Sequence, residues 1–375
     1  NNCLYCGFRK DNKELKRRVL SMEEIEKEIK ILLDQGHKRI LLVAGEHPKL
    51  NNIDYVVQAV NTIYQTSSGN ASIRRVNVNC APLSIEEYRR LKESNIGTYQ
   101  LFQETYHNET YRRMHPSGPK ALYGWRIEAP SRAMEAGIDD VGIGPLFGLF
   151  DWKFEVMATL MHAQYLDGKY GVGPHTISVP RLEPALNAPV AMNPPFQITD
   201  DDMKMIVATL RLAVPYTGII LSTRERPEFR DQLFALGVSQ TSAGSRTSPG
   251  GYSDAEAHKP DAEQFSIGDT RDLAELTCQM CREGYIPSFC TACYRSHRTG
   301  GNFMKLAKHG EIHKMCEPNA LLSFKEYLID YADAQTRVEG EKILAERLAK
   351  LSPNMRKKTE ALLAEIETGK RDVYI

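Results

Sequence analysis

The chain has 375 residues, 42% of them hydrophobic, which is enough to bury a large core in one α/β barrel with an extension or in two domains. Its 48 Lys and Arg residues equal its 48 Asp and Glu residues, so the charge excludes the basic footprint of a protein that binds nucleic acid or an anionic membrane. No apolar run reaches the roughly 18 residues that a membrane span requires, so we expect no membrane partner either.

Capping and apolar patterns predict that helices and strands alternate along the chain. Ser21-Met22-Glu23-Glu24 is a capping box that begins a helix to about Leu33, closed by Gly36. The run KRILLVAG at 38–45 is short, apolar and rich in β-branched residues, which is typical of a buried strand. Six more strands are expected at 75–80, 98–104, 139–146, 175–182, 218–225 and 238–245. The helices between them are expected at 53–64, 84–94, 126–136, 153–170, 200–213 and 226–236.

Seven strands, each but the last followed by a helix, indicate a parallel sheet of the α/β class. We expect a (β/α)8 barrel of the TIM type. The chain opens in a cysteine loop that should follow a strand, so the first strand of the barrel is expected upstream of Asn1. An open doubly wound sheet is the alternative, but no G-x-G-x-x-G phosphate loop follows any predicted strand.

Beyond the barrel the composition changes. Residues 246–269 are rich in Gly, Ser, Pro and charge, which predicts a loop over the barrel mouth or a linker. Helices are then expected at 273–283, 323–331 and 335–367, the last of them broken near Ser352-Pro353. We therefore expect a barrel at 1–245, a linking loop at 246–272 and a helical extension at 273–375.

The cysteines lie in two groups. Cys3 and Cys6 stand at the start, five others fall between Cys278 and Cys316, and only Cys80 stands alone. In a chain of this size, that distribution is typical of a reducing, cytoplasmic compartment rather than of a disulfide-linked secreted protein. Taken alone, Cys3-x2-Cys6 is either a redox pair or half of a zinc site.

The late cysteines offer a metal site. Cys290, Cys293 and Cys316 provide three thiolates, which cannot close a four-coordinate structural zinc site. They can hold three irons of a 4Fe–4S cube and leave the fourth iron open for another ligand. The alternative is a four-thiolate zinc site in which Cys278 and Cys281 join Cys290 and Cys293. The predicted helix that contains the first two of these cysteines opposes that alternative.

The opening loop resembles a known motif. Cys3-Leu4-Tyr5-Cys6 is similar to the end of C-x3-C-x-(aromatic)-C, the cluster loop of radical S-adenosylmethionine (SAM) enzymes. The first cysteine of that motif would stand two positions before Asn1. The resemblance implies a 4Fe–4S cluster held by Cys3, Cys6 and that upstream cysteine, with SAM on the open iron and Tyr5 in the cofactor site.

The next strand end carries a second resemblance. Ala44-Gly45-Glu46 resembles the Gly-Gly-Glu element of the same superfamily, which receives the amino group of the methionine moiety. A small residue such as Gly45 lets the strand end approach a ligand, and the Glu46 carboxylate accepts hydrogen bonds from an ammonium group. Catalytic residues of such barrels lie at this carboxyl end of the strands.

Two further segments match the superfamily. Glu104 ends a strand and Arg132 lies in the helix after it, and the resemblance implies that they pair and hold the methionine carboxylate. A purely structural ion pair is an equally good interpretation. Gly142 and Gly144 resemble the backbone segment that packs against adenine, or else they only relieve crowding inside the barrel.

Polar residues on the later strands are substrate candidates. His175 shares a strand face with Ile177, and we expect it to reach the lumen as an iron ligand or a catalytic substrate contact, although a lone strand histidine is usually structural. Arg224 is the candidate for a catalytic contact with the substrate carboxylate, because its guanidinium binds carboxylates with two parallel hydrogen bonds. Ser222 and Ser242 offer hydroxyls to the polar end of an amino acid.

More narrowly, the whole chain is similar to the family of tyrosine lyases that mature FeFe-hydrogenase, near relatives of the thiamine-pathway tyrosine lyases. The similarity lies in residues 3–12, 103–107, 115–120, 135–149, 173–184 and 287–301. The spacing C-x2-C-x22-C of Cys290, Cys293 and Cys316 marks the maturases and distinguishes them from the thiamine-type enzymes.

This resemblance implies a carbon–carbon lyase that splits L-tyrosine between Cα and Cβ into p-cresol and dehydroglycine. It also implies that dehydroglycine becomes carbon monoxide and cyanide on iron at a second, C-terminal Fe–S cluster, and it allows an extra iron there. The expected partners are a flavodoxin-like or ferredoxin-like reductant and other hydrogenase maturation proteins. The alternatives are a thiamine-type lyase that stops at dehydroglycine and a metal-binding scaffold that catalyses nothing.

Overall fold

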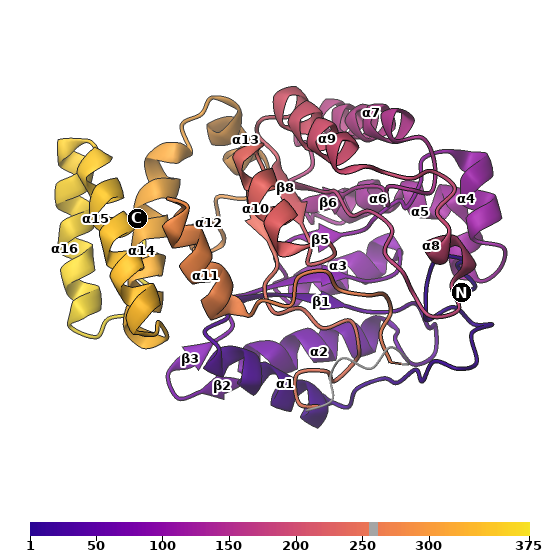
Figure 1. Cartoon of the computed structure of the whole chain (residues 1–375), viewed down its shortest axis with the longest axis horizontal. Coiled ribbons are helices and arrows are strands. Elements are labelled where there is room, and N and C mark those ends of the chain that lie inside the picture. The colour runs from indigo at the N-terminus through magenta and orange to yellow at the C-terminus, as the bar shows by residue number, and fades with distance from the viewer. Residues whose placement is uncertain (255–261) are drawn as a thin grey trace.

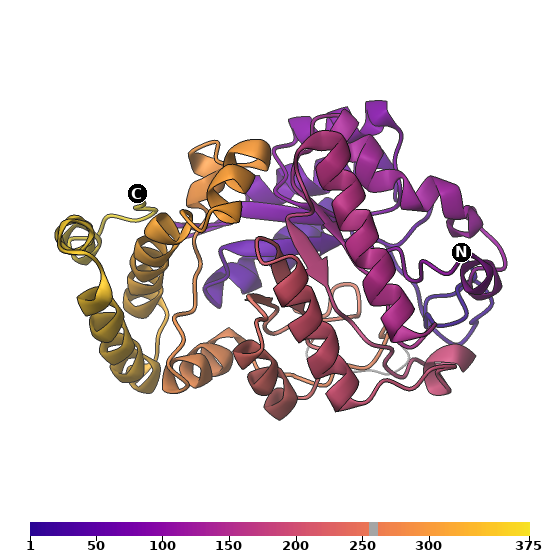
Figure 2. The ribbon, with the colours of Figure 1, turned by 90° about the horizontal axis from the view of Figure 1, so that it is seen from above.

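The computed structural model describes residues 1–254 and 262–375. Seven parallel strands lie in sequence order in one curled sheet (Figure 1, Figure 2). They are β1 (Arg39–Val43), β4 (Arg75–Asn79), β5 (Tyr99–Gln100), β6 (Val141–Ile143), β7 (Thr176–Ser178), β8 (Gly218–Leu221) and β9 (Gln240–Thr241). This arrangement confirms the predicted α/β fold of the TIM type. The strand expected upstream of Asn1 falls outside this sequence and stays a prediction.

Helices follow the strands. They are α1 (Met22–Asp34), α2 (Ile53–Gln65), α3 (Ile85–Glu93), α4 (Asn108–Met114), α5 (Tyr123–Ile127), α6 (Ala129–Glu135), α7 (Trp152–Tyr170), α8 (Pro189–Met192), α9 (Asp200–Ala213) and α10 (Pro227–Ala235). The predicted capping boxes are present at Ser21 and Ser84, where each serine accepts a hydrogen bond from the third helical residue. No helix in the described ranges is both long and apolar enough to cross a membrane.

The two faces of the sheet differ in polarity because side chains alternate along a strand. Val76 and Val78 of β4 are fully buried in the core between the sheet and the helices. The intervening residues Arg75, Asn77 and Asn79 therefore point to the inner face of the curled sheet. In β1, residues 39, 41 and 43 are register partners of those three residues and share that inner face.

Several elements differ from the sequence prediction. The strand expected at 98–104 is only Tyr99–Gln100, and the helix expected at 126–136 is divided into α5 and α6. Pro130 lies in the first turn of α6, where a missing N–H costs nothing, so a new helix begins there. The patterns did not reveal α4, α8 or a small hairpin of β2 (Ser67–Ser68) and β3 (Ala71–Ser72).

The C-terminal part is helical and has its own core. Its helices are α11 (Leu273–Arg282), α12 (Ala292–Arg295), α13 (Gly300–Lys308), α14 (His313–Asp330), α15 (Ala334–Lys350) and α16 (Pro353–Glu367). The predicted break at Ser352-Pro353 is confirmed, whereas α14 begins ten residues before the helix expected at 323. Leu321, Phe324 and Ile366 are fully buried in this second core. Helices α14 to α16 and the N-terminus lie at opposite ends of the molecule (Figure 1, Figure 2).

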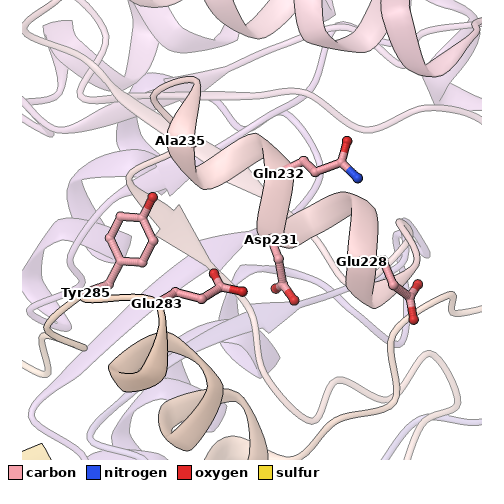
Figure 3. A pocket seen from close by; sticks show the side chains of 6 residues that line it. All are labelled: Glu228, Asp231, Gln232, Ala235, Glu283 and Tyr285. Atoms are coloured by element: carbon pink, nitrogen blue, oxygen red, sulfur yellow. The ribbon is translucent and has the colours of Figure 1, made fainter.

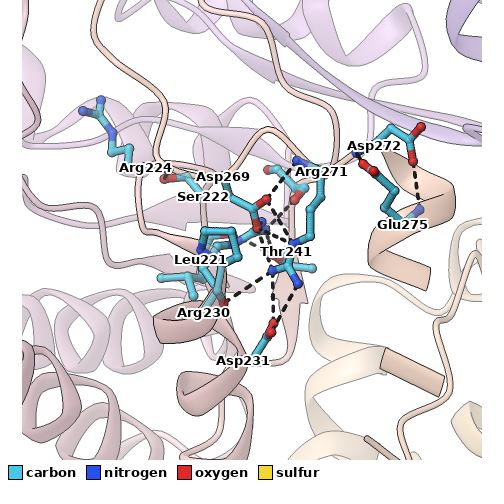
Figure 4. Close-up of polar contacts among 12 residues, drawn as sticks. Leu221, Ser222, Arg224, Arg230, Asp231, Thr241, Asp269, Arg271, Asp272 and Glu275 are labelled. Atoms are coloured by element: carbon cyan, nitrogen blue, oxygen red, sulfur yellow. Dashed lines mark hydrogen bonds and ion pairs between the residues drawn. The ribbon is translucent and has the colours of Figure 1, made fainter. Parts of the chain in front are cut away.

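A buried ionic network joins the barrel to the C-terminal part (Figure 4). Arg230 of α10 forms an ion pair with Asp269, and both side chains are fully buried. Arg230 also donates a hydrogen bond to the Thr241 hydroxyl of β9. Arg271 approaches Asp269 at 2.7 Å and Asp231 at 3.1 Å. The network therefore fixes the last strand, α10 and the segment that enters α11 to one another.

Candidate functional site

The N-terminal cysteine loop is tightly held. Cys3 is buried and Cys6 is partly exposed, and the two thiols lie within electrostatic range of each other. The N–H of Gly7 donates to the Gln264 carbonyl at 3.1 Å, and the Gln264 side-chain amide donates to the Cys6 sulfur at 3.5 Å. A Cβ on Gly7 would lie 2.8 Å from that carbonyl oxygen, so the loop requires glycine there. The Cys6 sulfur thus has a polar neighbour, whereas Cys3 is packed in an apolar cluster with Tyr5 and Met114.

This loop covers the carboxyl end of β1. The Asn1 side chain donates to the Glu46 carboxylate at 2.6 Å, and Ala44 continues the sheet by donating to the Asn79 carbonyl at 2.9 Å. A Cβ on Gly45 would meet nothing within 4 Å, so there is open space beside this strand end. The sequence-predicted pair Gly45 and Glu46 therefore lies next to the cysteine loop, as a cofactor site at this edge would require.

Tyr5 is held by a histidine that the sequence analysis did not single out. The Tyr5 hydroxyl lies 2.8 Å from Nε2 of His115, and the other ring nitrogen of His115 lies 2.7 Å from the Tyr111 carbonyl. A carbonyl only accepts, so His115 donates from Nδ1 and accepts the Tyr5 proton at Nε2. Burial, followed by the charge of Lys120, lowers the pKa of His115 to about 3, so the ring is neutral at physiological pH.

Glu104 is the most strongly constrained carboxylate of this edge. Its backbone has a positive φ of 72°, which is unusual for a residue other than glycine and is found preferentially at functional sites. Its carboxylate lies 2.5 Å from Lys120 and 3.2 Å from Arg126. Burial alone would raise the pKa of Glu104, but the charges of Lys120 and Arg126 outweigh burial and lower it to about 2.

The predicted pairing of Glu104 with Arg132 is wrong. Arg126 of α5 takes that place, while Arg132 of α6 donates to the carbonyls of Leu83 and Trp125 and stacks 3.6 Å from the Trp125 ring. The physical reason is the break between α5 and α6, which the sequence pattern read as one helix. The cofactor roles of Glu104 and Arg132 stay predictions.

We expect Glu104→Gln to remove a pH-dependent part of the stability. The folded-state pKa is about 2 and the ordinary value is 4.5, so the carboxylate stabilises the fold above pH 4.5, and this contribution is lost as the pH falls toward 2. The shift corresponds to on the order of 3 kcal/mol. Urea unfolding of the cluster-free chain at pH 7 and pH 3 measures this contribution. The difference in free energy of unfolding between wild type and variant should be smaller at pH 3 than at pH 7.

The matched control is Glu128→Gln, because Glu128 is 72% exposed and pairs only loosely with Arg132 at 3.8 Å. Such a pair contributes at most about 1 kcal/mol. If Glu104→Gln lowers the free energy of unfolding by no more than Glu128→Gln does, or by the same amount at both pH values, the Glu104 pairs contribute little.

The two glycines of β6 and its exit are constrained by the protein itself. A Cβ on Gly142 would lie 2.5 Å from the Thr176 hydroxyl, and one on Gly144 would clash with the Ser178 carbonyl. Relief of crowding, the structural alternative, therefore accounts for both residues. Their contact with adenine stays a prediction.

Arg224 lies on the same edge of the sheet, beyond β8, and its guanidinium takes no part in the network of Figure 4. It stacks 3.4 Å from the Phe265 ring, and within the described residues no carboxylate forms an ion pair with it. Burial lowers the pKa of Arg224 to about 10, with Glu104 as the largest opposing charge. The Arg224 N–H donates to the Ser222 hydroxyl at 3.4 Å. Ser242 lies on the neighbouring strand exit, where its N–H donates to a carbonyl of β8.

His175 lies at the other end of the sheet, just before β7. Its ring is 3.7 Å from Asp140 and 4.8 Å from the Phe303 ring of α13. Nδ1 is buried and has no hydrogen-bond partner in the part of the chain that the structure describes. His175 is thus separated from Arg224 by the length of the strands, and its role as an iron ligand or substrate contact stays a prediction.

The late cysteines gather at this amino end. The thiols of Cys290, Cys293 and Cys316 lie within electrostatic range of one another. Among the cysteines, only Cys278 acts electrostatically on the Cys281 thiol. In residues 1–254 and 262–375, no three Cys, His, Asp or Glu side chains are close enough to hold a single metal ion, and the Cys278–Cys281 pair lies apart from the other late thiols. A 4Fe–4S cube spaces its thiolates more widely than one ion, and three soft donors without a fourth fit such a cube.

A shallow hollow in the surface lies elsewhere (Figure 3). It has a volume of about 450 Å³ and lies between α10 and the segment after α11, lined by Glu228, Asp231, Gln232, Ala235, Glu283 and Tyr285. A second cavity of about 550 Å³ is lined by residues of α4 and α5 and the turn between them. Neither cavity contains a residue that the sequence analysis singled out.

Comparison with known proteins agrees with this geometry. Residues 1–161 match the family described as "Radical SAM superfamily", and residues 178–286 match the "Biotin and Thiamin Synthesis associated domain". The chain is 33% identical to the 2-iminoacetate synthase of Escherichia coli (strain K12) over 288 residues, 76% of this chain and 73% of that protein. The crystal structure of HydG, a maturase of the FeFe-hydrogenase, has a TM-score of 0.96 and 52% identity over 100% of this chain and 81% of its own. HydG from Carboxydothermus hydrogenoformans has a TM-score of 0.84 and 46% identity over 97% and 79%.

Proposed function

Because the chain belongs to the radical SAM family that contains HydG and the 2-iminoacetate synthases, we propose that it is a carbon–carbon lyase acting on L-tyrosine. It breaks the Cα–Cβ bond and releases dehydroglycine and p-cresol. The hydrogen atom taken from tyrosine ends in 5′-deoxyadenosine, and the p-cresol fragment gains one electron from the reductant and one proton, which balances the reaction. The observation that carries the proposal is the placement of two thiol groups, Cys3 with Cys6 and Cys290 with Cys293 and Cys316, at opposite ends of one curled sheet.

At the carboxyl end, the protein binds and orients the cofactor and the substrate. When bound, the 4Fe–4S cluster would supply the electron that cleaves SAM. The radical formed from SAM would take a hydrogen atom from the tyrosine amino group. Cys3 and Cys6 would hold the cluster, Gly45 and Glu46 the methionine amino group, and Glu104 with its cationic partners the methionine carboxylate.

Arg224 supplies the positive charge for the tyrosine carboxylate. Support comes from its partial burial, its stacking on Phe265 and the lack of a carboxylate partner in the described part of the chain. Two parallel hydrogen bonds to a carboxylate would satisfy this guanidinium. Ser222, which accepts from the Arg224 N–H, and Ser242, on the neighbouring exit of β9, would meet the remaining polar atoms of the amino acid.

At the amino end, dehydroglycine is converted into carbon monoxide and cyanide. The anion HN=CH–COO⁻ gives one CO, one cyanide and one water, so the step gains and loses no electrons. Cys290, Cys293 and Cys316 would hold the second Fe–S cluster, and His175 would bind an extra iron beside it. Support comes from the three mutually close thiols and from the unpartnered nitrogen of His175.

The proposal extends to the cellular setting and the parts of the chain. We place the protein in the cytoplasm with a flavodoxin-like or ferredoxin-like reductant and other hydrogenase maturation proteins as partners. We divide the chain into a barrel at 1–245, a linking loop at 246–272 and the cluster-bearing extension at 273–375, and the separate core of the last helices supports that division.

The test is an anaerobic incubation of full-length, cluster-reconstituted protein with tyrosine, SAM and dithionite. The expected result is p-cresol together with cyanide. p-Cresol without cyanide would favour the thiamine-type lyase, and no p-cresol would favour the metal-binding scaffold. An iron and sulfide count with electron paramagnetic resonance separates two clusters from one cluster plus zinc.

Arg224→Gln should weaken tyrosine binding. Removing one charged partner of a buried carboxylate pair costs about 2–5 kcal/mol, which corresponds to a rise in KM for tyrosine of at least about 30-fold. The affinity for SAM should stay within about twofold of wild type. Arg226→Gln is the control, because Arg226 is 56% exposed and pairs with Asp200 at the surface. An unchanged KM for tyrosine in Arg224→Gln would remove Arg224 from the substrate site.

A further inference from the structure

Two arginines stand side by side at the amino end of the sheet. Arg39 begins β1 and Arg75 begins β4, and the parallel register pairs them directly. Both therefore point to the inner face, and each guanidinium acts on the other by electrostatic repulsion. Like charges directly opposite each other destabilise a sheet, so this pair has a cost that some other interaction must offset.

The contacts that the two guanidinium groups make are all with uncharged groups. Arg39 donates to the carbonyls of Ser288 and Cys290 at 3.1 and 3.4 Å. Arg75 donates to the side chains of Asn77 and Thr98 at 2.8 and 2.5 Å. Over the ranges 1–254 and 262–375, neither arginine forms an ion pair with a carboxylate. Hydrogen bonds to neutral acceptors leave both positive charges in place.

The acidic residue that shares Tyr294 with Arg75 is already engaged. Asp140 accepts hydrogen bonds from the Tyr294 hydroxyl and from the Gly300 N–H, and His175 lies 3.7 Å away. Tyr294 also presents its ring to Arg75, 3.7 Å from the guanidinium carbon. Two positive charges thus face one negative charge, and the amino end of the inner face retains a net positive charge.

This positive charge lies beside the late cysteines. Arg39 contacts the carbonyl of Cys290 itself, and its charge acts on the Cys290 thiol. Arg75 is stacked by Tyr294, which directly follows Cys293 in the chain. The segment that carries the second thiol group therefore packs against both arginines.

We propose that Arg39 and Arg75 bind the carboxylate of the two-carbon imino acid that the first step releases, and hold it against the Cys290–Cys316 segment. This inference rests on the proposed function and assigns the binding residues of its second step. Nε of Arg39 and Nη1 of Arg75 make no hydrogen bond within the described residues, so each arginine retains a donor for an anion. A planar carboxylate matches such donors, and its charge removes the repulsion between the pair.

The inner face of β1 connects the two ends of the sheet. Beyond Arg39, Leu41 and Val43 lie on the same inner face and continue it toward the carboxyl end of the strand. Glu46, next to the first cysteine loop, is seven residues from Arg39, or about 23 Å along an extended strand. A small anion released at the carboxyl end would follow this inner face to reach the arginine pair.

The test compares Arg39→Gln and Arg75→Gln with wild type in the reconstituted holoenzyme. The rate of p-cresol formation should stay within about twofold of wild type. The amount of cyanide formed per p-cresol should fall at least about tenfold. Dehydroglycine that is not held hydrolyses to glyoxylate and ammonia, so glyoxylate should rise by the amount that cyanide falls. Arg39→Lys should recover part of the cyanide, because it keeps the charge and loses the planar fork.

A binding measurement gives a readout apart from turnover. Oxamate is a stable, planar anion of two carbons, and calorimetric titration of wild type should show binding that is at least about tenfold weaker in Arg39→Gln. The control is Arg89→Gln on α3, because Arg89 is 59% exposed and removal of its charge leaves the inner face unchanged.

Each other outcome contradicts the inference. Normal cyanide and oxamate binding in both variants would show that the arginines do not hold the anion. Loss of iron from Arg39→Gln and Arg75→Gln, with cyanide falling in proportion, would show that they only compensate the charge of the cluster. Loss of p-cresol in both variants would place them in the first step instead. Failure of wild type to form p-cresol would contradict the proposed function itself.

Discussion

Replacing Cys293 by Ser is expected to abolish cyanide formation while p-cresol continues to form. Cys293 stands between the other two thiols of the late group in the chain, and its sulfur is within electrostatic range of both. A serine oxygen is a hard ligand and does not replace a thiolate in an iron–sulfur cluster. Because the Cys3 and Cys6 loop lies at the opposite end of the sheet, the first step should keep its rate within about twofold.

The expected loss of cyanide is at least about 100-fold, since even residues outside the ligand set change metal-site activity by about 10–100-fold. The matched control is Cys278→Ser, a thiol of the same C-terminal part that is close to Cys281 and not to the other group. Its cyanide yield and iron content should equal those of wild type. Loss of zinc in Cys278→Ser would favour the four-thiolate zinc site, loss of iron would show that Cys278 helps to hold the cluster, and cyanide from Cys293→Ser would show that the late thiols do not hold the second site.

The repeating elements could be predicted because their signals are local. Seven apolar runs gave seven strands in the right order, and Ser21 and Ser84 cap helices as their capping boxes indicate. The break at Ser352-Pro353 follows from the missing N–H of proline. The late cysteines also come together as their spacing predicts, because α12 to α14 fold the segment between Cys293 and Cys316 back on itself.

The partners of the charged residues could not be predicted in the same way. Glu104 pairs with Arg126 rather than Arg132 because α5 ends before α6 begins, and hydropathy alone read one continuous helix. Lys120 and His115 lie in a segment without periodicity, and the resemblance of that stretch gave them no individual role.

The arginine pair depends on strand register. Arg39 and Arg75 lie 36 positions apart in the numbering, and only the alignment of β1 with β4 brings them together. Parallel register is fixed by tertiary packing of the outer faces, so no pattern within either strand reveals it. Long-range electrostatic pairs of this kind are therefore where the structure adds most to the sequence.

Asp269→Ala should be among the most destabilising substitutions in the chain. Arg230 is fully buried, and its ion pair with Asp269 is equally buried, so the variant leaves a guanidinium in the interior without a carboxylate (Figure 4). Breaking a buried pair in this way costs about 3–5 kcal/mol. Arg271 keeps its second partner Asp231 at 3.1 Å and cannot neutralise a like charge, so it offers no compensation.

The control is Asp231→Ala, because Asp231 is 17% exposed and Asp269 still pairs with Arg271 when it is removed. Partly exposed pairs contribute about 1 kcal/mol or less, so the two variants should differ severalfold in the free energy of unfolding. Urea unfolding followed by circular dichroism measures the difference.

The network joins β9, α10 and the entry to α11, so Asp269→Ala should also loosen the extension from the barrel. The amount of cyanide formed per p-cresol should therefore fall. Equal destabilisation by both variants would show that water reaches Arg230 in the interior. It would also show that the contact between the barrel and the extension depends on apolar packing instead.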